Sequence, residues 1–96
     1  MIARFHRAAE RELAAAIEIG EERGGGLGQE LLEEVERTVA LLCQFPEVGE
    51  PLDGQRRRLS LKRFPFGVIY RVDADTLRIL ALAHRRQRPR YWSRRR

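Results

Sequence analysis

The sequence predicts an α+β fold in which two helices precede a small, largely antiparallel sheet. Two segments with apolar residues at three- and four-residue steps fill the first half of the chain, and three consecutive glycines separate them. After about residue 56 the apolar spacing changes to two residues, which is typical of strands. Because the two patterns are segregated along the chain, we expect a helical hairpin packed on one sheet.

The first half begins with a short predicted strand over residues 1–6, where Ile2 and Phe5 are the larger apolar groups. An amphipathic helix is expected from Arg7 to about Arg23, with an apolar stripe of Ala9, Leu13, Ala16 and Ile17. The glycines at 24–26 end it, because glycine has a large conformational entropy cost in a helix. A second helix runs to Pro46, with a stripe of Leu27, Leu31, Val35, Val39 and Leu42. So short a connection predicts an antiparallel helical hairpin over about 7–44.

The second half contains a predicted three-stranded antiparallel meander over about 56–84. Residues 46–54 are expected to be a loop, because they include Pro51 and an Asp53-Gly54 turn signal. In the first strand Arg58, Ser60 and Lys62 alternate with Leu59 and Leu61. In the second strand one face is formed by Phe66, Val68, Tyr70 and Val72. Residues 73–75 are a tight turn, so the strands around them are antiparallel neighbours. Residues 76–83 are apolar on both faces, with Leu77, Ile79, Ala81 and Ala83 alternating with Leu80 and Leu82, which predicts an interior strand.

Composition limits the possible classes of protein. A chain of 96 residues with 43% hydrophobic residues fits a single domain over 1–96. The single cysteine, Cys43, excludes a disulfide framework and a cysteine-based metal cluster. The N-terminus lacks the apolar core of a signal peptide and no apolar run approaches about 20 residues, so we expect a cytoplasmic protein without membrane contact. His6 and His84 have no acidic partners at metal-ligand spacing, and the glycine-rich segment 24–28 lacks a phosphate-loop ending. We therefore expect no metal and no cofactor.

Charge is distributed unevenly along the chain. Residues 1–54 hold five arginines and twelve acidic residues, whereas residues 55–96 hold fourteen basic residues and two aspartates. A half-chain this basic projects a positive potential that attracts polyanions or an acidic protein. The alternatives are that the charges form a solvated face, or that the two halves neutralise each other in the folded protein.

The basic tail, residues 85–96, interleaves arginines with Tyr91 and Trp92. Guanidinium groups bind phosphate bidentately and aromatic rings stack on bases, so this mixture suits RNA or single-stranded nucleic acid. Alternatively the rings pack back on the sheet, which we favour for Trp92 because so small a domain has few large groups for its core. His84, where the last strand meets the tail, either caps the sheet by hydrogen bonding or is a titratable group at a site.

Taken together, these features resemble the RelE/ParE superfamily of type II toxin–antitoxin modules over nearly the whole chain. The resemblance rests on Leu27-Gly28 opening the second helix, Phe45-Pro46 closing it, the strand segment 63–70 and the ending 84–92. It implies the βααβββ fold of these toxins and an antitoxin that wraps around the toxin. The positive charge of residues 55–96 further predicts that this antitoxin is acidic and binds a basic face of the toxin. The candidates for this face are Arg56, Arg57, Arg58 and Lys62.

The resemblance leaves two activities open. ParE-like members inhibit DNA gyrase, and the target-binding candidates for this role are His84, Arg85, Arg88, Tyr91, Trp92 and Arg94. RelE-like members cut mRNA on the ribosome without a metal, and the residues that this activity would use are Arg63, Arg85, Arg88 and Tyr91. Nuclease members commonly carry an arginine three residues before the strand tyrosine, where this chain has Gly67, which cannot stabilise charge. The sequence therefore favours the gyrase inhibitor, which is not an enzyme, over the nuclease. A third possibility is a homologue that retains only antitoxin binding.

Overall fold

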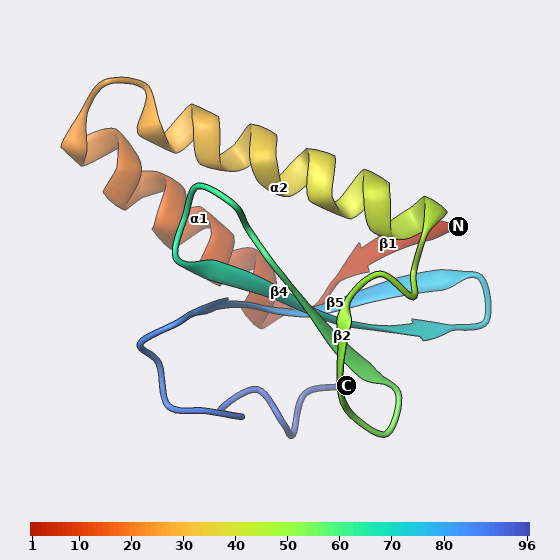
Figure 1. The fold of residues 1–96 in the computed structure, drawn as a ribbon. Helices are drawn as coiled ribbons and strands as arrows, with labels where there is room; N and C mark the ends of the chain where they lie inside the picture. The colour runs from red at the N-terminus through yellow and green to blue at the C-terminus, as the bar shows by residue number, and fades with distance from the viewer.

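The computed structural model describes residues 1–96 as two helices and five strands. Their order is β1 (Ile2–Phe5), α1 (Arg7–Arg23), α2 (Leu27–Gln44), β2 (Glu50–Asp53), β3 (Arg56–Ser60), β4 (Phe66–Asp73) and β5 (Thr76–His84). The strands form one mixed sheet in the order β1-β5-β4-β3-β2, in which β1 is parallel to β5 and the other neighbours are antiparallel. The helices lie on one side of the sheet and the tail on the other (Figure 1). The predicted α+β class is confirmed.

Both helices have the bounds that the sequence pattern predicts. The imidazole Nδ1 of His6 accepts a hydrogen bond from the amide of Ala8 (3.0 Å) and so caps the start of α1. The glycines that connect the helices have φ values of 78°, 68° and 76°, which glycine adopts without strain. The helices approach closely at Gly28, where a Cβ atom would lie 2.6 Å from the carbonyl oxygen of Ile17. Neither helix combines the length and apolar character that a bilayer crossing needs.

The predicted loop over 46–54 contains an additional strand, β2, so the predicted three-stranded meander has four strands. β2 pairs antiparallel with β3 and lies at the edge of the sheet. Its sequence, Glu50-Pro51-Leu52-Asp53, has the composition of a loop because it contains proline and two acidic residues. Proline is tolerated here because β2 is an edge strand, whose backbone has no neighbour on one side.

The predicted alternation in β5 is wrong beyond Ile79, because Leu80 is an extra residue in the ladder. Ile69 of β4 pairs with Ala81, but Tyr70 pairs with Ile79. Such a bulge turns the following side chains to the other face of the sheet. The helix-facing core therefore contains Leu77, Ile79 and Leu82, whereas Leu80, Ala81 and Ala83 belong to a second apolar cluster with Ile69 and Trp92.

Candidate functional site

The tail covers the sheet face that the helices leave open. Trp92 is only 4% exposed and packs with Ile69, Leu80, Ala81 and Ala83. This burial agrees with the packing role that we favoured for its ring, and it corrects the inclusion of Trp92 among the target-binding candidates. A buried indole is not available to a partner while the tail is docked.

Two arginines clamp the tail around Asp53. Arg56 donates to both carboxylate oxygens of Asp53 (2.9 and 3.2 Å) and to the carbonyl oxygen of Ser93 (2.7 Å). Arg90 forms an ion pair with the same carboxylate. Both guanidinium groups also lie over the ring of Trp92, at 5.1 and 5.6 Å from its centroid. The hydrogen bond from Arg90, together with that from Arg56, holds the pKa of Asp53 below its ordinary value.

A second anchor joins the tail to α1 through Glu12. Its carboxylate accepts hydrogen bonds from the Tyr91 hydroxyl (2.8 Å), from both Nη atoms of Arg95 (2.9 Å each) and from the Leu82 amide (3.0 Å). Burial first, and then the hydrogen bond to Glu12, raise the pKa of Tyr91. The phenol therefore stays protonated at neutral pH, which does not suit it to act as a general base.

The four basic residues expected to face the antitoxin divide into two pairs. Arg56 belongs to the Asp53 clamp, and Arg57 donates to the carbonyl oxygens of Glu47 (3.1 Å) and Gly49 (2.8 Å). These two arginines therefore hold other segments of the chain in place, and their role in a partner-facing surface stays a prediction. The side chains of Arg58 and Lys62 make no ion pair or hydrogen bond, and remain available to a partner.

His84 contributes to the turn that follows β5. Its Nδ1 accepts a hydrogen bond from the amide of Arg86 (3.0 Å), and its ring meets the ring of Phe66 edge-on at 5.1 Å. This hydrogen bond is the capping arrangement that the sequence offers as one alternative for His84. By contrast Arg85, Arg88 and Arg94 are exposed and carry no side-chain partner.

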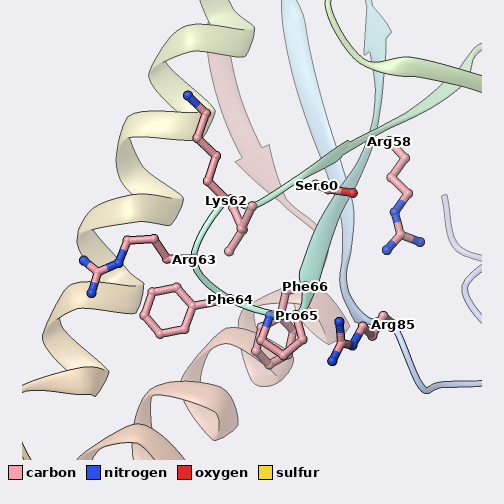
Figure 2. Close-up of a pocket in the computed structure, with 9 residues that line it drawn as sticks. Arg58, Ser60, Lys62, Arg63, Phe64, Pro65, Phe66 and Arg85 are labelled. Atoms are coloured by element: carbon pink, nitrogen blue, oxygen red, sulfur yellow. The ribbon is translucent and has the colours of Figure 1, made fainter.

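A concave surface of about 420 Å³, the basic cleft, is lined by Arg58, Ser60, Leu61, Lys62, Arg63, Phe64, Pro65, Phe66 and Arg85. Figure 2 shows Arg58, Ser60 and Arg85 at one side of the cleft, while Lys62 and Arg63 extend toward α2. There Arg63 pairs with Glu30 at 2.8 Å. A smaller cleft of about 180 Å³, the tail cleft, adjoins it and shares two residues with it, Arg58 and Arg85.

Gly67 gives the basic cleft its particular geometry. A Cβ atom at this position would lie 2.6 Å from Nε and 2.9 Å from Cζ of Arg58. The guanidinium of Arg58 therefore covers the backbone of Gly67, which is on the neighbouring strand. Gly67 pairs with Ser60, two residues after Arg58, so the approach depends on the register between β3 and β4.

Comparison with known proteins identifies the family. The model described as "ParE toxin of type II toxin-antitoxin system, parDE" matches residues 3–89. The chain belongs to the ParE toxin family. A solved structure of the chromosomal ParDE TA system from P. aeruginosa shares the fold with this ParE-family toxin, with a TM-score of 0.65 and 24% identity over 88% of this chain and 95% of that chain. No curated protein sequence matches. Family membership makes the chain the toxin of a type II module, whose partner is an antitoxin.

In this ParE-family toxin, three of the four residues that a nuclease would use lie near one another. Arg85, Arg88 and Tyr91 line the tail cleft, whereas Arg63 is paired with Glu30 at α2. Arg58 lines the same tail cleft, although the sequence pattern placed it on an antitoxin-facing surface. Sequence reasoning also missed Glu12 and Asp53 as tail anchors. Their acidic side chains are ordinary in a helix and in a turn, and only the fold brings the tail to them.

Proposed function

We propose that this ParE-family toxin arrests growth in the cytoplasm by binding and inhibiting DNA gyrase, without enzymatic chemistry of its own. The match of the ParE toxin model to residues 3–89 carries the proposal. It is supported by Tyr91, whose hydroxyl is hydrogen-bonded to Glu12 and whose pKa is raised by burial. Among the six target-binding candidates, Trp92 is buried, and His84 and Tyr91 take part in internal hydrogen bonds. The exposed candidates without a side-chain partner are Arg85, Arg88 and Arg94.

A supercoiling assay with purified gyrase tests the proposed target. We expect the toxin to inhibit supercoiling at micromolar excess, and addition of the cognate antitoxin to restore it. Arg88→Ala combined with Arg94→Ala should weaken inhibition, whereas Arg37→Ala, which removes an exposed charge on α2, should not. Unimpaired supercoiling in the presence of folded toxin would refute gyrase as the target.

A second candidate function is ribosome-dependent cleavage of mRNA, and one observation favours it. Arg58 covers Gly67 and brings a positive charge to the place where the sequence lacked one. Preorganised charge of this kind can stabilise a transition state at phosphorus. Toeprinting of translated mRNA distinguishes the two functions, because a nuclease should produce cuts that disappear in Arg85→Ala and in Tyr91→Phe. Unbroken mRNA would exclude the nuclease.

Growth assays address the possibility of a homologue that has lost activity. Induced expression without the antitoxin should stop growth if the chain is an active toxin. Normal growth with soluble, folded protein present would instead indicate a protein that retains only antitoxin binding.

The antitoxin is proposed to be acidic and to form a hetero-oligomer with the toxin, using both charge and apolar contacts. Arg58 and Lys62 supply unpaired positive charge on β3 and just after it. An apolar groove of about 360 Å³ between β1 and α1 is lined by Phe5, Leu13, Ala14 and Ile17, with Glu10 beside them. Its size and lining suit aliphatic side chains of an antitoxin segment.

Ala14→Arg tests this groove, because the position is exposed and a helix tolerates arginine. The long side chain should fill the groove and lower antitoxin affinity by about tenfold or more, the loss expected for one central contact. Ala15→Arg adds the same charge at the next exposed position, outside the groove, and serves as the control. Equal affinity of both variants, measured by calorimetry, would remove the groove from the interface.

A further inference from the structure

Positive charge without acidic partners is concentrated around Arg58 and Arg85. Neither arginine forms an ion pair or donates a side-chain hydrogen bond, and no carboxylate lines the basic cleft or the tail cleft. This contrasts with Arg56, Arg90 and Arg95, whose charges are balanced by Asp53 and Glu12. An unbalanced pair of guanidinium groups in a concave surface favours an anionic ligand.

The position of Arg58 is built into the sheet. Its guanidinium occupies space that any side chain at residue 67 would take, since a Cβ there would lie within 3.0 Å of three of its atoms. In Figure 2 the hydroxyl of Ser60 lies beside Arg58, on the same side of the cleft as Arg85. The cleft thus offers two guanidinium groups and a hydroxyl, all of which can donate to oxygens of one anion.

We propose that Arg58 and Arg85 bind a backbone phosphate of a single-stranded nucleic acid. Positive side chains continue in both directions from this pair. Lys62 in the basic cleft and Arg88 in the tail cleft have no acidic partner, whereas Arg63 and Arg90 are paired with Glu30 and Asp53. Such a line of charge matches a ligand with a phosphate at every unit. The rings of Phe64 and Phe66 line the basic cleft as well, and aromatic rings stack on bases. This inference goes beyond gyrase inhibition and does not depend on it.

Fluorescence anisotropy with the isolated full-length toxin tests the site. The probes are a labelled oligothymidylate and a labelled oligouridylate, which distinguish DNA from RNA as the source of the phosphate, and an oligoglutamate peptide of equal charge. Arg58→Ala and Arg85→Ala should each weaken oligonucleotide binding roughly tenfold. Each lost contact should also lower the slope of log affinity against log salt by about 0.7.

Two further variants separate a built site from diffuse charge. Gly67→Ala leaves the net charge unchanged but displaces the guanidinium of Arg58, and it should weaken binding as Arg58→Ala does. The displaced atoms are the flexible end of a side chain, so the fold should be retained, as a thermal melt will verify. Arg86→Ala removes a neighbouring exposed charge that lines neither cleft and should bind as the parent does.

The proposal is overturned if Arg86→Ala weakens binding as much as Arg85→Ala, because charge alone would then explain the affinity. It is also overturned if folded Gly67→Ala binds as the parent does. The oligoglutamate peptide gives a third test. If it binds as tightly as the oligonucleotides, with the same dependence on Arg58 and Arg85, the proposed phosphate ligand is refuted and the site binds carboxylates. None of these outcomes bears on gyrase, which is absent from the assay.

Discussion

The hydroxyl of Tyr70 ties the segment before β2 to the middle of the sheet. Tyr70 is completely buried, and its Oη accepts a hydrogen bond from the amide of Gly49 (3.0 Å) and donates one to the carbonyl oxygen of Pro46 (2.6 Å). Burial raises the pKa of Tyr70, so its donor proton is retained through neutral and mildly alkaline pH. One side chain therefore satisfies two backbone groups of an irregular segment.

Tyr70→Phe should lower the free energy of unfolding by about 1–3 kcal/mol, because it leaves the buried amide of Gly49 without its partner. Urea unfolding followed by circular dichroism gives this value. Ser60→Ala is the control, since this exposed hydroxyl forms no hydrogen bond and its loss should change stability by less than about 0.5 kcal/mol. Equal stability of the two variants would show that the Tyr70 tie contributes nothing.

The roles of three consecutive arginines could not be predicted from the sequence. Arg56 clamps the tail, Arg57 holds loop carbonyl oxygens and Arg58 covers Gly67 in the cleft. Their residue type and local pattern are the same, so charge alone assigns them one role. The faces of β3 and its register with β4 separate them, and neither is encoded within the segment itself.

At the scale of elements, both helices and the last two strands follow from periodicity, because each has an uninterrupted apolar pattern. The two departures are β2 and the bulge at Leu80. A four-residue edge strand containing proline has the composition of a loop. A bulge in a strand that is apolar on both faces leaves no polar residue out of place, so the sequence pattern cannot reveal it.

Gly28→Ala should destabilise the helical pair, although alanine usually stabilises a helix by up to about 1 kcal/mol relative to glycine. The added Cβ would lie 2.6 Å from the Ile17 carbonyl oxygen and 2.7 Å from Cγ of Glu21. We expect a loss of about 1–3 kcal/mol, as for other overpacked contacts. Gln29→Ala, at the next and exposed position, should remain within about 0.5 kcal/mol of the parent. A Gly28→Ala variant that melts at or above the parent temperature would contradict the close contact.

The His6 cap makes the stability of α1 dependent on pH. Burial, and then the nearby charge of Arg78, lower the pKa of His6 from its ordinary 6.5 in the folded protein. The unfolded chain therefore binds more protons below pH 6.5, and protonation also removes the acceptor that Ala8 needs. The contribution of the cap is complete above pH 6.5 and falls as the pH decreases toward the folded pKa.

His6→Asn should reduce this pH dependence, since asparagine caps a helix without titrating. We expect the parent to lose more stability than the variant between about pH 7.5 and about pH 5 in thermal melts. His84 is present in both proteins, so the difference between them isolates His6. Parallel pH profiles would show that the cap does not control the acid sensitivity.

At the scale of the whole molecule, the tail is a third layer and not an appendage. Helices cover one sheet face, and residues after β5 cover the other by burying Trp92 (Figure 1). Its arginines predict a ligand-binding segment, whereas two of them, Arg90 and Arg95, are held by Asp53 and Glu12, which are far away in sequence. Only the assembled sheet makes those distant partners neighbours.

Arg56→Ala should loosen the tail without unfolding the sheet. Trp92 is the single tryptophan, so its emission should shift to longer wavelength while the circular dichroism of the helices is unchanged. Trypsin should cut the tail roughly tenfold faster, as expected when local stability falls by on the order of 1.4 kcal/mol. Arg94→Ala, which removes an unpaired exposed charge from the tail, should leave the emission unchanged. An unshifted emission in Arg56→Ala would mean that the clamp does not hold the tail.

The bond between Glu12 and Arg95 also bears on the order in which the fold forms. These residues are 83 positions apart, so their contact closes a long loop of chain. Until the tail docks, Ile69 and Leu80 lie uncovered on the open face. Closure of that face is a late folding step, because contacts between distant parts of a chain form only after the intervening chain is available. A folding toxin therefore passes through a stage in which this apolar sheet face is exposed, and such a stage is prone to aggregation.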